Sequence, residues 1–320
     1  MASIYKTIRN EDIASTRTIL HEAIPLTGTI VSGTYSDSNI KNYTHGMFQS
    51  VYDYPYLSSS ANQVFDLSMG FSSGSVLSSS ATIQQSKKSN VYKQMAQVLM
   101  GYDKNGVIKR FDSDGDLFGT TTDKINDALF FTFSRLLVKD EIQKGTFSLE
   151  LGANYLYTAS FDHNRIIIKD VGAATDYRVN SPVGEYGILY VSNSAGRPLS
   201  GLNFDPNFAG TGKEQAAGLI FYQAGVVVLT SSVFLGTAQG GLLSSSVEWE
   251  INKQFITASI TGSNIETNSN SLRHRISNLS FNNTVELNST IYFCHLGANE
   301  FNYSSNPTYL SGSQIVVKVD

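Results

Sequence analysis

The sequence predicts a mainly-β protein whose C-terminal part is an antiparallel, jelly-roll-like β-sandwich. Hydrophobic residues alternate with a period of two along much of the chain, and turn residues separate these runs at short intervals. In residues 146–320 no long amphipathic helices alternate with strands, which argues against a parallel nucleotide-binding sheet. The runs are rich in β-branched and aromatic residues, which suit a pleated, half-buried surface.

Nine segments of the C-terminal part are predicted strands. They are Thr146–Leu151, Arg165–Lys169, Ile188–Val191, Leu219–Tyr222, Gly225–Thr230, Val247–Ile251, Phe255–Ile260, Thr290–Cys294 and Gln314–Val319. Clusters of Gly, Asn, Asp, Thr and Ser between them, such as Ser192–Gly196 and Gly262–Asn270, are typical of turns.

The first 145 residues are mixed, with one or two short helices and extended arms. Residues 1–35 carry little packing signal and are predicted to be an arm, residues 36–145 a mixed α+β interaction region, and residues 146–320 the β-sandwich domain. Lys124–Ile142 fits a strand or a helix, and a short helical turn at Lys139–Lys144 fits either interpretation.

One helix is predicted with an N-cap at Asn90 and an end at Gly101. Its apolar positions recur at helical spacing, at Val91, Met95, Val98 and Leu99.

Composition excludes several classes of protein. The 320 residues carry a net charge of −4, which argues against binding nucleic acid or an anionic membrane surface. No apolar run has the length of a membrane span and no signal peptide is evident, so we expect a soluble chain made in the cytoplasm. The single cysteine, Cys294, excludes an internal disulfide and is expected to be a small core residue.

Three motifs suggest chemistry, each with a simpler alternative. Gly70–Gly74 matches the G-x-S-x-G nucleophile elbow around Ser72, but no helical pattern follows it and a serine-rich loop is the simpler interpretation. Gly210–Lys213 fails the phosphate-loop pattern at both ends. Arg273-His274-Arg275 is interpreted as a solvated strand or loop, with partner contact as the alternative. We predict no catalytic residue and no cofactor.

Acidic residues between 112 and 123 are the one candidate metal site. Three carboxylates alternate, but an EF-hand loop requires Gly at its sixth position and Glu at its twelfth, where Leu117 and Asp123 stand. A hairpin tip is the simpler alternative. The weak calcium candidates are Asp112, Asp114, Asp116 and Asp123.

Two segments combine aromatic and small polar residues with few charges, Asn39–Leu57 and Phe301–Ser313. Subunit interfaces are depleted in Lys, Glu and Asp and enriched in aromatic residues. We therefore predict that both segments pack on neighbouring subunits, with aromatic loops over the chain's own core as the alternative. The predicted interface residues are Tyr43, Met47, Phe48, Tyr52, Tyr54, Tyr56, Phe301, Tyr303 and Tyr309.

Four stretches, Asn39–Phe71, Asn90–Gly106, Phe133–Gly152 and Ser289–Lys318, resemble virion structural proteins of large contractile-tailed, T4-related bacteriophages, including those of marine hosts. The resemblance implies a non-enzymatic protein in the virion, assembled in the host cytoplasm, whose partners are itself and other virion proteins. Within the particle we expect the tail assembly, baseplate or neck. The alternatives are a capsid decoration protein, a receptor- or glycan-binding fibre module in which Trp249 stacks on a sugar, and a particle-bound esterase or glycosidase.

Overall fold

The structure is a computed structural model that describes residues 7–25, 37–75, 83–113, 115, 124–152, 165–192, 216–234, 265–273, 275–295, 310–311 and 314–315. Its contacts divide the chain into two units. One unit consists of Met1–Leu20 and Glu286–Asp320, and the other is His21–Val285. The second unit contains the helices α1 (Ile83–Leu99), α2 (Arg135–Val138) and α4 (Ile265–Arg273). The 3-10 turn η1 (Asn10–Asp12) belongs to the first unit, and the 3-10 turns η2 (Asp37–Asn39) and η4 (Ser231–Phe234) belong to the second.

Thirteen strands form one large antiparallel sheet, so the mainly-β prediction is confirmed. The path through the sheet runs β1-β13-β7-β8-β10-β11-β12-β5-β4-β3-β2, with β6 paired to β13 and β9 to β10, while β14 and β15 form a separate pair. The strands are β1 (Ile13–Pro25), β2 (Ile40–Asn42), β3 (Gln49–Tyr52), β4 (Gln63–Phe71), β5 (Asp127–Phe133), β6 (Glu141–Ile142), β7 (Ser148–Gly152), β8 (Arg165–Lys169), β9 (Tyr177–Ser181), β10 (Gly184–Ser192), β11 (Ala216–Phe221), β12 (Val226–Thr230), β13 (Ile276–Tyr292), β14 (Leu310–Ser311) and β15 (Gln314–Ile315).

Seven of the nine predicted strands overlap strands of the structure, whereas Val247–Ile251 and Phe255–Ile260 lie outside the described residues. The contact-based units divide the chain at other positions than the predicted boundaries at residues 35 and 145. The sheet itself crosses residue 145, because β5 of the predicted interaction region pairs with β12 of the predicted sandwich domain.

The sheet of the His21–Val285 unit folds back on itself around an aromatic core. Phe133 on β5 lies 5.1 Å, between ring centroids, from Phe281 on β13 and 6.2 Å from Phe147, although five strands separate β5 from β13 along the sheet. All three rings are buried. Burial of aromatic side chains on facing parts of one sheet therefore creates a sandwich-like core.

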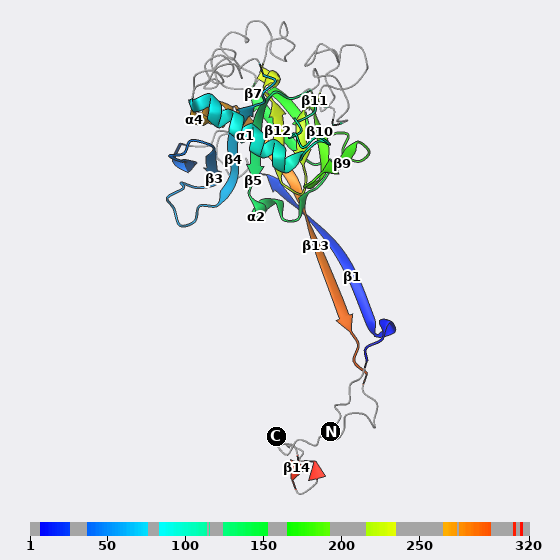
Figure 1. Cartoon of the computed structure of the whole chain (residues 1–320). Coiled ribbons are helices and arrows are strands. Elements are labelled where there is room, and N and C mark those ends of the chain that lie inside the picture. Colours follow the sequence, from blue (N-terminus) through cyan, green and yellow to red (C-terminus); the bar gives the residue numbers. More distant parts are fainter. Residues whose placement is uncertain are drawn as a thin grey trace. The chain divides into compact units, whose positions relative to one another are not determined.

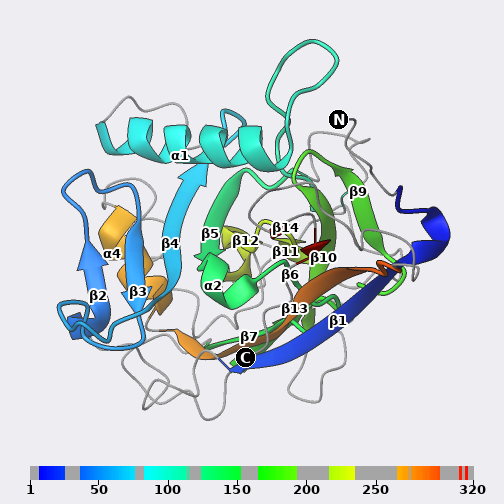
Figure 2. The same ribbon diagram turned by 90° about the horizontal axis from the view of Figure 1, so that it is seen from below.

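Helices cover the two faces of β4 (Figures 1 and 2). Successive side chains of a strand point to opposite faces. On one face Asn268 and Ser269 of α4 form hydrogen bonds with the Met69 thioether and the Leu67 carbonyl. On the other face α1 lies so close to Gly70 that a β-carbon there would be 2.4 Å from the Lys88 carbonyl oxygen.

Tyr92 joins α1 to the segments on either side of the 114–123 region. Its hydroxyl donates to the Ile125 carbonyl (2.6 Å) and accepts from the Phe111 amide (3.2 Å), while its ring packs edge-on against Phe111. All three residues are buried. Burial also raises the pKa of Tyr92, so the hydroxyl keeps its proton.

Tyr92→Phe is therefore expected to lower the free energy of unfolding by about 2 kcal/mol, because two buried backbone groups lose their partner while the ring is kept. Urea unfolding followed by circular dichroism measures the effect. Tyr102→Phe, at a half-exposed tyrosine beyond the end of the same helix, is the control and should change stability little. An equal effect of the two substitutions would contradict the role given to the Tyr92 hydroxyl.

Several helix predictions need correction. The predicted helix exists, and Gly101 follows its end with φ +71°, but α1 begins at Ile83 rather than after Asn90. Lys139–Lys144 is not helical, since α2 ends at Val138 and β6 follows. The ambiguous segment Lys124–Ile142 forms strand β5, then the short helix α2 and then strand β6.

The predicted turn at Gly262–Asn270 is wrong from Ile265 onward, where α4 begins, and residues 262–264 lie outside the described residues. The buried side chains of α4 recur at helical spacing, but most of them are polar, so the apolar periodicity is weak: Ile265, Asn268, Ser269, Leu272 and Arg273.

Burial also overturns two predictions near β13. Arg273 and Arg275 are buried, rather than lying in a solvated loop, and Arg273 donates to the Asp37 carboxylate across 2.7 Å. Cys294 is exposed, past the end of β13, rather than a core residue. Within the described residues no helix is long and apolar enough to cross a bilayer.

Candidate functional site

The predicted interface segment Asn39–Leu57 forms β2, β3 and the loops beside them. Three rings of the β2–β3 connection pack together, with centroids of Tyr43, His45 and Phe48 between 4.8 and 5.1 Å apart. Met47 and Phe48 are half-buried and line a cavity. The alternative of aromatic side chains folded over the chain's own core therefore describes part of this segment.

The tyrosines that follow β3 lie further into solvent. Tyr54 is 58 % exposed and Tyr56 is also exposed, whereas Tyr52, the last residue of β3, is half-buried, with its ring centroid 6.4 Å from that of Tyr56. Such side chains are available to a partner, and their role in an interface stays a prediction. Phe301, Tyr303 and Tyr309 lie outside the described residues.

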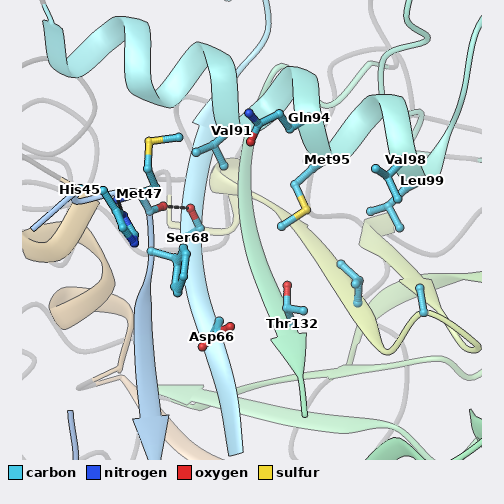
Figure 3. A pocket seen from close by; sticks show the side chains of 13 residues that line it. His45, Met47, Asp66, Ser68, Val91, Gln94, Met95, Val98, Leu99 and Thr132 are labelled. Atoms are coloured by element: carbon cyan, nitrogen blue, oxygen red, sulfur yellow. Dashed lines mark hydrogen bonds between the residues drawn. The ribbon is translucent and has the colours of Figure 1, made fainter. Parts of the chain in front are cut away.

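A cavity of about 650 Å³ lies between α1 and the sheet face that carries Asp66 and Ser68 (Figure 3). Helix α1 covers the Gly70 end of this face, and the cavity occupies the face beside it. Apolar side chains dominate its walls. The lining residues are His45, Met47, Phe48, Asp66, Ser68, Val91, Gln94, Met95, Val98, Leu99, Thr132, Ala224 and Val226.

The sheet register places Asp66 in the floor of the cavity. Ser50, Asp66, Thr132 and Val226 are successive partners across β3, β4, β5 and β12. They form one transverse row, and the last three line the cavity. The close-up shows Asp66 and Thr132 on neighbouring strands below α1 (Figure 3).

The Asp66 carboxylate accepts two hydrogen bonds, both at the same oxygen. Ser50 Oγ and Gln63 Nε2 each donate to Oδ1 across 2.6 Å. The Ser50 hydroxyl also lies 3.2 Å from the Tyr43 hydroxyl, so the chain of contacts reaches the aromatic cluster. Burial raises the pKa of Asp66 above its ordinary value of 3.8, and the two hydrogen bonds act in the opposite direction.

His45 stands at the side of the cavity, next to Met47 (Figure 3). Its Nδ1 accepts the Met47 amide proton across 3.0 Å. In the neutral ring the proton therefore resides on Nε2, which is a hydrogen-bond donor.

In the candidate calcium loop, the one described carboxylate, Asp112, takes part in an ion pair. Asp112 is fully buried and forms an ion pair with Lys124, and the two residues pair as an antiparallel bridge. Gly115 has φ +68°, a backbone conformation that favours glycine. Asp114, Asp116 and Asp123 lie outside the described residues. Among the described residues, no group of three acidic, His or Cys side chains could hold a metal ion.

Ser72 lies in the turn that follows β4 and is buried. Its hydroxyl donates to the Asn126 amide oxygen (2.6 Å) and accepts from the Gly74 amide (3.1 Å). A serine nucleophile requires a base as its hydrogen-bond partner, whereas Ser72 has a neutral amide. The geometry fits a turn-stabilising serine. The Gly210–Lys213 segment lies outside the described residues.

Sequence reasoning missed the cavity because it missed β4. The signal was present: Phe65, Leu67, Met69 and Phe71 alternate with a period of two, which is typical of a strand. Asp66 falls on the opposite face of this strand. A single carboxylate among polar and apolar neighbours does not by itself indicate a binding site.

Comparisons of the chain with models of known protein families, with curated proteins and with solved structures find no match.

Proposed function

We propose that the chain is a structural subunit of a tailed-bacteriophage virion, in the tail assembly at the baseplate or neck, and that it acts by self-association and contact with other virion proteins. The sequence resemblance supports the virion. The observation that carries self-association is the two-stranded ribbon formed by the parts of β1 and β13 in the Met1–Leu20/Glu286–Asp320 unit.

Hydrogen bonds between side chains define the two faces of this ribbon. Thr16 bonds to Ser289 across 2.7 Å, while Ser15 bonds to Thr290 across 3.3 Å, so these two pairs project from opposite faces. The Arg17–Glu286 ion pair lies on the face of Ser15. The other face, which we call the uncharged face, consists of Ala14, Thr16, Thr18, Leu20, Leu287, Ser289 and Ile291.

The uncharged face leaves large apolar side chains in contact with water. Leu20, Leu287 and Ile291 are 50, 51 and 51 % exposed. A two-stranded ribbon is only marginally stable in water unless a third layer or strand covers it. Depletion of charge on an exposed apolar surface is typical of an interface, so a second copy of this ribbon suits the uncharged face.

Replacing Leu287 and Ile291 together by aspartate tests this interface. We expect the wild-type chain to self-associate in sedimentation velocity experiments. The dissociation constant of the double variant should be at least about tenfold higher than that of the wild type, because each aliphatic side chain buried in the interface contributes roughly 2 kcal/mol to association. The unfolding transition of the His21–Val285 unit should not change.

Val179→Asp is the matched control, since Val179 is 70 % exposed on β9, outside the ribbon. A wild-type chain that is monomeric at all concentrations, or a double variant that associates like the wild type, would refute self-association through the ribbon. Imaging of the intact particle with antibody against the chain tests the tail location, and label on the capsid would favour the decoration alternative.

A glycan-binding fibre module remains the alternative function. Its predicted sugar platform, Trp249, lies outside the described residues. Aliphatic side chains and methionines make up most of the lining of the described cavity, whereas stacking on a sugar requires a flat aromatic ring. A glycan array with the purified chain tests this alternative directly.

A further inference from the structure

The cavity beside α1 has the size and lining of a small-molecule site. Its volume of about 650 Å³ lies within the range of roughly 300–1,000 Å³ that is usual for ligand clefts. Met95 and Leu99 come from α1, Val226 from β12, and Met47 and Phe48 from the β2–β3 connection. Walls from several separate elements form a concave apolar surface with a few polar groups in its floor.

One charge lies in this lining, and it is negative. Asp66 is the acidic residue among the lining side chains, and no Lys or Arg is among them. Ser50 and Gln63 both donate to Oδ1 of this carboxylate, and no described residue donates a hydrogen bond to Oδ2. The Thr132 hydroxyl is adjacent, on the residue paired with Asp66. The floor therefore presents an acceptor that is half-buried and lacks a cationic partner from the lining.

We propose that this cavity binds an apolar monoamine, with its ammonium group on the Asp66 carboxylate and its hydrocarbon body between α1 and β12. A carboxylate in apolar surroundings gains most from a ligand that brings both a positive charge and hydrogen-bond donors. Phe48 adds an aromatic side chain to the apolar lining that faces the hydrocarbon body of the ligand. An anionic ligand of the same shape is repelled, and a neutral alcohol leaves the charge uncompensated.

The probe is n-octylamine, compared with n-octanol and n-octanoate, and the readout is the carbon-13 methyl spectrum of the methionines in the full chain. Met47 and Met95 line the cavity, whereas Met69 lies on the opposite face of β4 and serves as an internal control. We expect octylamine to shift the Met47 and Met95 signals saturably and to leave Met69 unchanged. Octanoate should bind at least about tenfold more weakly.

Two substitutions test the assigned contacts. Asp66→Asn keeps the shape of the side chain, and it should weaken octylamine binding about tenfold or more while octanol binding is retained. Ala224→Phe places a large ring in the cavity and should abolish binding of all three probes. Asp127→Asn is the matched control, because Asp127 is a half-buried carboxylate outside the cavity that accepts a hydrogen bond from Ser75.

The pH dependence gives a further readout. The ammonium binds the ionised form of Asp66, whose pKa burial raises above 3.8. The other titratable groups near Asp66 are His45, which lines the cavity, and Tyr52, which interacts with the carboxylate electrostatically. Octylamine binding should tighten as pH rises through the raised pKa of Asp66, and Asp66→Asn should remove this part of the pH dependence.

Equal binding of octylamine and octanoate, or unchanged Met47 and Met95 signals, would overturn the proposal. Met47 and Met95 signals that shift with protein concentration and not with amine would also overturn it, in favour of a second copy in the cavity. The wild-type probe series decides the question even if a variant fails to fold. The result is independent of the ribbon experiment, since the ribbon residues do not line the cavity.

Discussion

Gly70→Ala is expected to lower the free energy of unfolding by about 2–3 kcal/mol, through overpacking between α1 and β4. A β-carbon at residue 70 would lie 2.4 Å from the Lys88 carbonyl oxygen and 2.7 Å from the Tyr92 amide nitrogen. Both are backbone atoms of α1, so no side-chain rotation relieves the clash and the helix must move. Chemical denaturation of the two chains measures the difference.

Gly106→Ala is the control for this substitution. Gly106 has φ +76° and open space around it, so alanine there costs only about 1 kcal/mol of left-handed backbone strain. Because α1 is one wall of the cavity, Gly70→Ala should also change the Met95 methyl signal, whereas Gly106→Ala should not. A Gly70→Ala protein as stable as the wild type would show that α1 does not pack against β4 in this way.

Lys124→Met is expected to destabilise the chain by about 3 kcal/mol, because it leaves the Asp112 carboxylate buried without its cationic partner. Asp112 is fully buried, and the Lys124 side chain is 15 % exposed. The two residues also pair across an antiparallel bridge. The loss of the charge partner therefore affects the junction between Phe111 and Ile125, against which Tyr92 of α1 packs.

A double-mutant cycle separates the ion pair from other effects. Asp112→Asn combined with Lys124→Met removes both charges, and it should be more stable than Lys124→Met alone. The same proteins test the calcium hypothesis for the acidic loop. If millimolar calcium stabilises the wild type, or restores Lys124→Met to wild-type stability, Asp112 serves a metal and the assignment to a structural ion pair is wrong.

Alternation along the chain was sufficient to predict many strands. Arg165–Lys169 coincides with β8, and Gly225–Thr230 differs from β12 by one residue. Both are short runs rich in β-branched residues, and a strand with that composition is determined largely by neighbours in the sequence. The Lys124–Ile142 segment remained ambiguous because Leu129 and Phe133 fit both the strand period and the helix period.

The candidate site was beyond the reach of such reasoning. Met47 and Phe48 were predicted to be anchors at a subunit interface, and their place in a cavity wall depends on α1, a helix that begins more than thirty residues further along the chain. Asp66 acquires its significance only because β3, β4 and β5 align Ser50, Asp66 and Thr132 in one row. The predicted interface role of the tyrosines after β3 stays a prediction.

The sequence by itself determined that the chain is mainly β, charge-poor and without an internal disulfide, because alternation, composition and cysteine count are properties of the chain alone. Only the tertiary structure decided that Arg273 is buried, that Cys294 is exposed and that Asp66 lies in the floor of a cavity. The physical reason is that burial is set by the surfaces that distant segments present to one another, and a polar residue on a covered face follows the same local pattern as one in water.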